Sequence, residues 1–312
     1  ANMNSQYLMK TYNLCVTQKS DSNPTAALVE VAKIIEIELD TCIKKCNLPQ
    51  HLEEAASYAV VNGGKRVRPT LTLLCSEAVG GTLDQAMPSA IAVELIHCFS
   101  LVHDDLPAID NDALRRGKPT LHVKSGEAMA ILAGDLLLPV AFSQLICEQY
   151  SNEQQARLTQ LLATATSNMV VGQVYDTLGG LPEHLDALQQ LEEIHHNKTG
   201  ALIRSACQMG AVCGNASPEE FEAISTFGSA IGLMFQIVDD LIDLHGSAEL
   251  VGKATGKDEE AGKTTYPGTI GVEASKLAVK DLQKKAETAI SSLNSDAETL
   301  SSFNVWMAQR TR

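Results

Sequence analysis

Two groups of aspartates stand out as the residues of this sequence that could do chemistry. In the first group, Asp104 and Asp105 end an apolar stretch (IAVELIHCFSLVH), and Asp110 follows five residues after Asp105. Apolar residues at three- and four-residue spacing predict a helix over 88–104, so the three carboxylates gather at one buried helix end. Carboxylates in that setting are candidate metal ligands.

The second group lies inside the segment FGSAIGLMFQIVDDLIDL, which also has the periodicity of a helix. Asp239 and Asp243 are four residues apart and therefore share one helix face, and Gln236 lies one turn earlier. No lysine or arginine interrupts this helix or the first one near its acids. The sequence thus places two unneutralised acidic groups on mostly apolar helices.

Acidic groups of this kind need a cation. Burying an unpaired carboxylate costs several kcal/mol per ion, which is comparable to the net stability of a domain. Oxygen ligands alone favour Mg²⁺ over zinc, and Mg²⁺ binds one or two protein carboxylates together with water and phosphate oxygens. The pattern therefore predicts a Mg²⁺ site for a substrate that carries phosphate.

Three other readings of the acids were weighed. A pair of aspartates at a helix end is usually a solvated surface feature, but two such groups on apolar helices favour a site. Asp105, Asp112 and Asp240 are the members most easily explained as supporting or exposed residues. His103 with Asp104 resembles the His-Asp pair of metal phosphohydrolases, but only His97 precedes them nearby as a possible further ligand.

Basic residues that could receive phosphate groups surround the acidic groups in the sequence. GGKRVRP (63–69) places cations at a glycine-rich turn before a helix, and Arg115 and Arg116 follow the first acidic group. Lys198 and Thr199 open another helix, and lysines also occur in the glycine-rich segment after the second group, at 253, 257 and 263. Each cluster alone could be a surface turn, but together they favour an anionic substrate.

Composition limits the other possibilities. The chain has 312 residues, 24 basic against 38 acidic, and a formal net charge of -14, so an anionic ligand needs a local basic cluster and nucleic acid is an unfavourable partner. The eight cysteines show no CxxC pair and are interpreted as reduced thiols. Without a signal-like start or 18 uninterrupted apolar residues, a cytoplasmic protein with no membrane span is expected.

The elements that must position these residues are helices throughout. Only 13 of the 312 residues are aromatic and strict alternation is absent, so the sequence predicts an all-α fold with one domain over 21–312 after a poorly defined segment, 1–20. Capping boxes are predicted at 151–154 and 217–220, and glycines at 80 and 179 and Gly214-Asn215 end helices. Polar connections are expected at 105–125 and 246–270. Helices are expected at 25–46, 51–62, 69–79, 88–104, 126–149, 153–178, 185–196, 199–213, 218–245, 271–293 and 296–309.

Six motifs in order resemble those of the trans-isoprenyl diphosphate synthases, most closely the bacterial-type farnesyl diphosphate synthases. They are GGKRVRP (63–69), LIHCFSLVHDDLPAIDNDALRRGKPTLH (95–122), LAGDLLL (132–138), NKTGALI (197–203), GLMFQIVDDLIDL (232–244) and GKTTYPGTIG (262–271). The resemblance implies the isoprenoid synthase fold, in which a single large helical domain surrounds a central apolar cavity. It also implies that the two acidic groups face each other across the cavity mouth and that the protein is a homodimer.

The resemblance assigns roles to individual residues. The Mg²⁺ ligands correspond to Asp104, Asp110 and Asp239, supported by Asp105 and Asp243. The allylic diphosphate site corresponds to Arg115, Lys198, Lys253 and Lys263. The isopentenyl diphosphate site corresponds to Lys65, Arg68, His97 and Arg116. The oxygen atoms that stabilise the allylic cation correspond to Thr199 and Gln236.

The resemblance also implies a mechanism. Three Mg²⁺ ions neutralise the leaving diphosphate, isopentenyl diphosphate attacks the allylic cation in a dry pocket, and a proton is lost, with the released pyrophosphate as base. The partners are then isopentenyl diphosphate and allylic diphosphates, and no nucleophilic side chain is needed.

Product length is predicted from Phe99, five residues before Asp104. An aromatic residue there blocks the cavity floor in similar short-chain enzymes, so the expected product is the C15 farnesyl diphosphate. Phe99 could instead be an ordinary core residue, and a C20 geranylgeranyl product is the main alternative. A terpene cyclase and a noncatalytic regulatory subunit fit less well, because both acidic groups are intact. The roles of Arg310 and Arg312 are left open.

Overall fold

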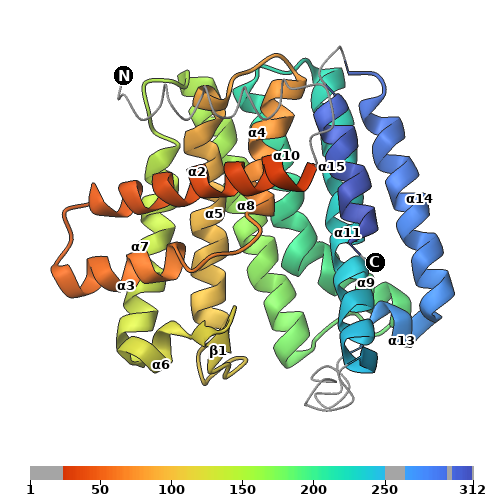
Figure 1. The fold of residues 1–312 in the computed structure, drawn as a ribbon, viewed down its shortest axis with the longest axis horizontal. Coiled ribbons are helices and arrows are strands. Elements are labelled where there is room, and N and C mark those ends of the chain that lie inside the picture. Colours follow the sequence, from red (N-terminus) through yellow and green to blue (C-terminus); the bar gives the residue numbers. More distant parts are fainter. Residues whose placement is uncertain (1–23, 250–263, 294–296, 311–312) are drawn as a thin grey trace.

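The computed structural model describes residues 24–249, 264–293 and 297–310, and it confirms the all-α fold (Figure 1). The predicted single domain is not tested by it and stays a prediction. The described elements, in chain order, are α2 (Pro24–Lys44), α3 (Gln50–Val60), α4 (Val67–Ala78), α5 (Leu83–Asp104), β1 (Leu114–Arg115), β2 (Lys118–Pro119), α6 (Leu121–Ser125), α7 (Glu127–Gln144), α8 (Asn152–Leu178), α9 (Ala187–His195), the π-helical turn η1 (His196–Gly200), α10 (Ala201–Cys213), α11 (Pro218–Glu249), α13 (Tyr266–Ile270), α14 (Val272–Ile290) and α15 (Glu298–Gln309).

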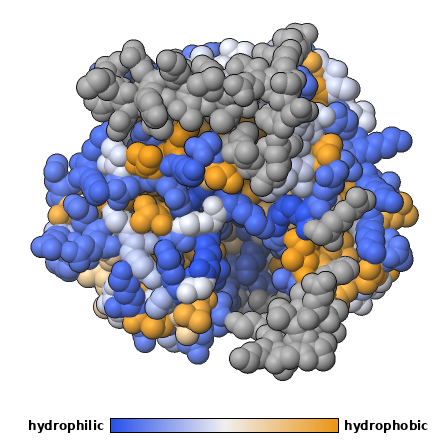
Figure 2. Space-filling model, viewed as in Figure 1, coloured by the Kyte–Doolittle hydropathy of each residue, from blue (hydrophilic) through white to orange (hydrophobic). Residues whose placement is uncertain are grey.

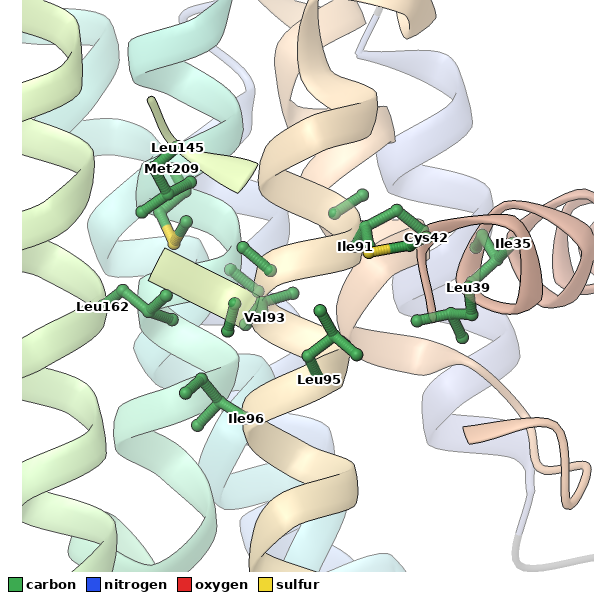
Figure 3. Close-up of a cluster of buried hydrophobic side chains, with 14 of the residues drawn as sticks. Ile35, Leu39, Cys42, Ile91, Val93, Leu95, Ile96, Leu145, Leu162 and Met209 are labelled. Carbon is green, nitrogen blue, oxygen red and sulfur yellow. The ribbon is translucent and has the colours of Figure 1, made fainter. Parts of the chain in front are cut away.

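Helix α5 runs through the middle of the core. In Figure 3 its side chains point to opposite sides: Ile91 lies toward Cys42 of α2, whereas Val93 and Ile96 lie toward Met209 of α10. A helix that is apolar on most of its surface must be covered on several sides, and α5 packs against α4, α7 and α10. This burial fixes the helix end that carries the first acidic group.

Several predicted boundaries were wrong, each for a local reason. Helix α5 begins at Leu83, five residues before the expected start, because Thr82 and Gln85 form a capping box there. Helix α7 ends at Gln144, not at 149. Segment 105–125, expected as a loop, contains the antiparallel pair β1 and β2 and the short helix α6.

The junctions between helices are mostly as predicted. Both capping boxes are present: Ser151 Oγ accepts from Gln154 N, and Ser217 Oγ accepts from Glu220 N. Gly80 and Gly179 adopt positive φ, whereas at the end of α10 it is Asn215 (φ 58°) that does so and not Gly214. The break expected between helices at 197–198 is absent, because η1 joins α9 directly to α10.

Among the residues that the structure describes, three helices are long and apolar enough to cross a membrane by length and composition, although none of them holds 18 uninterrupted apolar residues. They are α5, α7 and the part of α11 that ends at Leu244. In the most apolar 18-residue stretch of each helix, 67% of α5 and 56% of α11 are buried inside the protein, against 33% of α7. The apolar surface of α5 and α11 therefore serves mainly the core, and α7 keeps an exposed apolar face.

Candidate active site

The first acidic group lies at the C-terminal end of α5, where its three side chains have different surroundings. Asp105 is buried and accepts two hydrogen bonds from Arg115, at 2.5 Å from Nη2 and 2.8 Å from Nε. Asp110 is exposed, and its backbone N–H donates to the carbonyl of Asp104 (2.9 Å). The carboxylate of Asp104 has no hydrogen-bond or ion-pair partner among the described residues.

Asp104 is therefore the poorly compensated acid of this group. Burial is the main cause that raises its pKa from 3.8 to about 6, and the neighbouring charges of Asp110 and Asp105 add to the effect. Lys198 and Arg115 act in the opposite direction without cancelling it. A divalent cation at Asp104 would supply the missing positive charge.

A glycine of the LAGDLLL motif accounts for the position of this helix end. A side chain at Gly134 of α7 would overlap the ring of His103, the residue before Asp104. His103 is held by the carbonyl of Ile131 (3.1 Å) and by an edge-to-face contact with Phe99, whose ring centroid is 4.9 Å away. The close approach of α7 thus locks the last turn of α5.

The second acidic group is neutralised from a distant part of the chain. Nη2 of Arg310, at the end of α15, lies 2.5 Å from Oδ1 of Asp239, and its guanidinium lies over the rings of Phe235 and Trp306. Burial raises the pKa of Asp239, whereas Arg310 and then Lys65 lower it. Part of the charge on the two acidic groups is therefore met within the protein, because α15 and the segment with Arg115 bring arginines to Asp239 and Asp105.

Asp240 has a structural role, as its assignment to the supporting residues anticipated. It accepts a hydrogen bond from the backbone N–H of Tyr266 (2.8 Å) and lies 3.7 Å from His195. His195 in turn stacks on Tyr266 and contacts Nε2 of Gln236 through Nδ1 (3.3 Å). Asp243 lies one turn further along α11 and is exposed. These contacts fix the face of α11 that carries Asp239 and Gln236.

Lys198 and Thr199 lie in the π-helical turn η1, and glycines pack this turn tightly. A Cβ at Gly172 of α8 would overlap the backbone of Lys198, and a Cβ at Gly232 of α11 would lie 2.9 Å from Cα of Gly200. Single π-helical turns occur often at functional sites. Lys198 also forms an ion pair with Asp176 of α8 (2.6 Å), a partner that the sequence analysis missed.

Four residues predicted to bind one diphosphate line a single pocket of about 570 Å³, here called the diphosphate pocket. Those residues are Lys65, Arg68, His97 and Arg116. Figure 2 shows a hollow near the middle of this face of the molecule, with hydrophilic side chains on its left and hydrophobic ones on its right. Nε of Arg68 is buried without a partner, so the pocket offers a donor that a phosphate oxygen could satisfy. Burial, followed by the charges of Arg68 and Arg116, lowers the pKa of His97 and keeps its ring neutral.

Residues that sequence reasoning missed support this pocket. Arg66 has a left-handed backbone (φ 48°), and its buried guanidinium pairs with Glu94 of α5 at 2.7 Å. Arg116 donates to the carbonyl of Gly63, and a side chain at Gly64 would overlap its guanidinium. The long sequence separation of these pairs left no local signal. Lys118 and Phe235 also line the pocket.

The donor set fits Mg²⁺ only together with a ligand. Among the residues described here, no three His, Cys, Asp or Glu side chains lie together as a ready-made metal site, so the three gathered carboxylates expected at the end of α5 are not assembled as one. The reason is that Arg115 holds Asp105 and Asp110 is exposed. An unpaired Asp104 nevertheless suits Mg²⁺, which takes few protein ligands and adds phosphate oxygens.

Some predictions about the site remain outside what the structure describes. Lys253, Lys263 and Arg312 lie outside the described residues. The opposed arrangement of the two acidic groups and the central apolar cavity stay predictions.

Comparisons with known proteins agree with one another. The sequence profile of the polyprenyl synthetase family matches residues 49–300. A heterodimeric geranylgeranyl pyrophosphate synthase large subunit from Arabidopsis thaliana is 44% identical over 85% of this chain and 71% of its own. A farnesyl diphosphate synthase from Micrococcus luteus is 41% identical over 84% and 90%. The crystal structure of geranylgeranyl pyrophosphate synthetase from Pyrococcus horikoshii superimposes with a TM-score of 0.82, at 31% identity over 92% of this chain and 98% of that one.

Proposed function

The chain belongs to the polyprenyl synthetase family and is a short-chain prenyl diphosphate synthase, and we propose that its main product is farnesyl diphosphate. The observation that supports the enzyme activity is the diphosphate pocket, into which Lys65, Arg68, His97 and Arg116 converge from three separate segments. We assign this pocket to isopentenyl diphosphate. Asp239 lies close enough to act on the charges of both Lys65 and Arg68.

The allylic diphosphate is assigned to the space beside the end of α5. Lys198 and Arg115 are the cations whose charges act on Asp104, so they can bind a diphosphate whose Mg²⁺ ions are held by Asp104, Asp110 and Asp239. Mg²⁺, proposed at three per site, supplies charge neutralisation of the departing diphosphate. Arg115 and Lys198 orient that group, and their own partners, Asp105 and Asp176, hold them in position.

The allylic cation is proposed to lie beside Thr199 and Gln236. Thr199 is buried, and Gln236 directs its amide nitrogen to His195, which leaves its amide oxygen for a positive charge. An oxygen dipole aimed at developing positive charge stabilises the transition state without forming a covalent bond. The double bond of isopentenyl diphosphate then attacks, and released pyrophosphate accepts the proton.

Product length is the finer part of the proposal. Phe99 lies in α5, five residues before Asp104, and its side chain is half-buried. It packs against the hydrophobic core around α5 and contacts the ring of His103. An aromatic ring at this distance from Asp104 supports a product chain that is limited to 15 carbons. A C20 product is the second candidate, because most of the relatives compared are named geranylgeranyl pyrophosphate synthases.

We also propose a homodimer that forms through the exposed apolar faces of α7 and α8. Leu132 of α7 and Leu178 of α8 are 57% and 79% exposed, and Ile131, Val170 and Val174 are also exposed. Exposed apolar side chains gathered on one helix face are typical of subunit contacts. The proposed location is the cytoplasm, whereas several plant relatives are named as chloroplastic.

The proposal is tested by incubating the full chain with labelled isopentenyl diphosphate, Mg²⁺ and a C5, C10 or C15 allylic diphosphate, followed by sizing of the products. Consumption of the C5 and C10 substrates with accumulation at C15 is the expected result. Efficient extension of the C15 substrate to C20 would replace the farnesyl assignment by the geranylgeranyl one. No condensation with any allylic substrate would overturn both.

A further inference from the structure

A second pocket, of about 540 Å³, lies among α9, η1, α10, α11 and α14 and shares no lining residue with the diphosphate pocket. We call it the α10–α14 pocket, after Arg204 of α10 and Lys285 of α14, which both line it. Gly200 of η1 is also part of its wall, so an occupant would lie next to the turn that carries Thr199. None of the roles assigned above uses this pocket.

Arg204 presents an unmet hydrogen-bonding group to the pocket. Its Nε is buried without a partner, and its guanidinium has no hydrogen-bond or ion-pair partner among the described residues. Buried donors are almost always paired, so an orphaned guanidinium nitrogen indicates a place for an acceptor. Arg68 shows the same combination in the diphosphate pocket: a buried, unpartnered Nε at the wall of a cavity.

The acids that line the α10–α14 pocket, unlike its cations, have hydrogen-bond partners within the protein. Glu192 accepts a hydrogen bond from the hydroxyl of Tyr266, and Glu193 accepts one from Nδ2 of Asn197 (2.8 Å). Lys285 is exposed and, like Arg204, has no ion-pair partner in the described part of the chain. The unmet hydrogen-bonding demand is therefore for acceptor oxygens, which an anionic headgroup supplies.

The remaining lining is mixed: Gln189, His196 and Ser229 are polar, and the other side chains are apolar. The apolar ones are Leu185, Ala230, Leu233 and Leu282, and a small charged ion alone would leave this apolar part of the wall uncovered. Ligand sites typically combine a mostly apolar wall with a few polar groups that fix orientation. A ligand with an anionic head and a short apolar chain matches both halves.

We propose that the α10–α14 pocket is a second binding site, separate from the diphosphate pocket, for a soluble phosphate monoester that carries a short apolar chain. The phosphate lies between Arg204 and Lys285, and the chain lies against Leu233 and Leu282. Guanidinium groups bind phosphate oxygens in pairs, which gives Arg204 the larger share of the affinity.

The test measures octyl phosphate binding to the full chain by isothermal titration calorimetry in EDTA, which removes Mg²⁺-dependent binding. The Arg68→Gln variant serves as the parent protein, because this change weakens binding in the diphosphate pocket. The parent is expected to bind one octyl phosphate per chain. Adding Arg204→Gln or Lys285→Gln should weaken that binding about tenfold or more, as loss of a charged hydrogen bond does. Lys284→Gln, a matched change at the exposed neighbouring lysine outside the pocket, should leave the affinity unchanged.

Inorganic phosphate is the second probe and is expected to bind more weakly than octyl phosphate, because it leaves the apolar wall uncovered. Circular dichroism checks that each variant is folded, and Lys285→Gln, at an exposed position, carries the result if Arg204→Gln does not fold. The proposal is overturned if Arg68→Gln alone abolishes all octyl phosphate binding. It is equally overturned if folded Arg204→Gln and Lys285→Gln variants bind within twofold of the parent.

Discussion

Replacing Asp104 by Asn is expected to stabilise the Mg²⁺-free protein at neutral pH while removing most of its activity. The Asp104 carboxyl is largely buried with no cationic partner in the described structure, and its pKa is raised from 3.8 to about 6. Between these two pH values the unfolded chain has lost a proton that the folded protein keeps. The wild-type protein therefore loses stability as the pH rises through this window, and the whole loss is present above pH 6.

The difference between 3.8 and about 6 sets the size of the effect. This difference corresponds to a loss of at most about 3 kcal/mol in the free energy of unfolding, and partial contact of the carboxyl with solvent reduces the loss to about 1–3 kcal/mol. At the usual unfolding entropy per residue, a chain of this length gains roughly 1.5 °C in melting temperature per kcal/mol, so Asp104→Asn should melt ~2–4 °C higher at pH 8. At pH 4 the folded protein keeps the proton, whereas the unfolded chain, with its pKa of 3.8, has lost it only in part, so the difference in melting temperature should shrink to about 1 °C or less.

The assay is thermal unfolding in EDTA at pH steps from 4 to 8, followed by circular dichroism. Asp105→Asn is the matched control: it removes the closer carboxylate of Arg115, leaves only the 3.6 Å ion pair with Asp112, and is expected to lower the melting temperature. A melting temperature of Asp104→Asn at or below that of the wild type at pH 8, or a gain that persists unchanged at pH 4, would refute the reasoning.

Four further predictions concern the other parts of the site. Asp239→Asn should cut turnover at least ~10²-fold. Arg310→Gln should lower the Mg²⁺ concentration needed for half-maximal turnover, because Arg310 and the metal compete for the carboxylate of Asp239. An unchanged or higher Mg²⁺ requirement contradicts this competition. Phe99→Ala should shift the chain length of the products from C15 toward C20, because removing the ring opens space beside α5. A product that stays at C15 would show that another residue limits the chain length. Gly172→Ala should lower the melting temperature and kcat together, because the new methyl group overlaps the backbone of Lys198; wild-type values of both would show that α8 can move away.

The fold class followed from the sequence because helices are local structures. Apolar spacing showed which faces are buried, and short-range capping at Ser151 and Ser217 marked helix starts that the structure confirms. Boundaries failed where a local signal was overlooked: the Thr82 capping box lengthens α5, and η1 removes the break between α9 and α10. Four residues that line the diphosphate pocket were named from the sequence because they lie in motifs that resemble those of a known family.

Only the tertiary structure decided how the acids are neutralised. Asp239 and Arg310 are 71 residues apart, and Arg66 and Glu94 are 28 apart. Neither pair leaves a periodic or spacing signal, because such contacts depend on how whole helices pack. The same holds for Gly172, whose missing side chain matters only once α8 lies against η1. Sequence determines what each segment can do alone, and packing determines which charges, pockets and backbones meet.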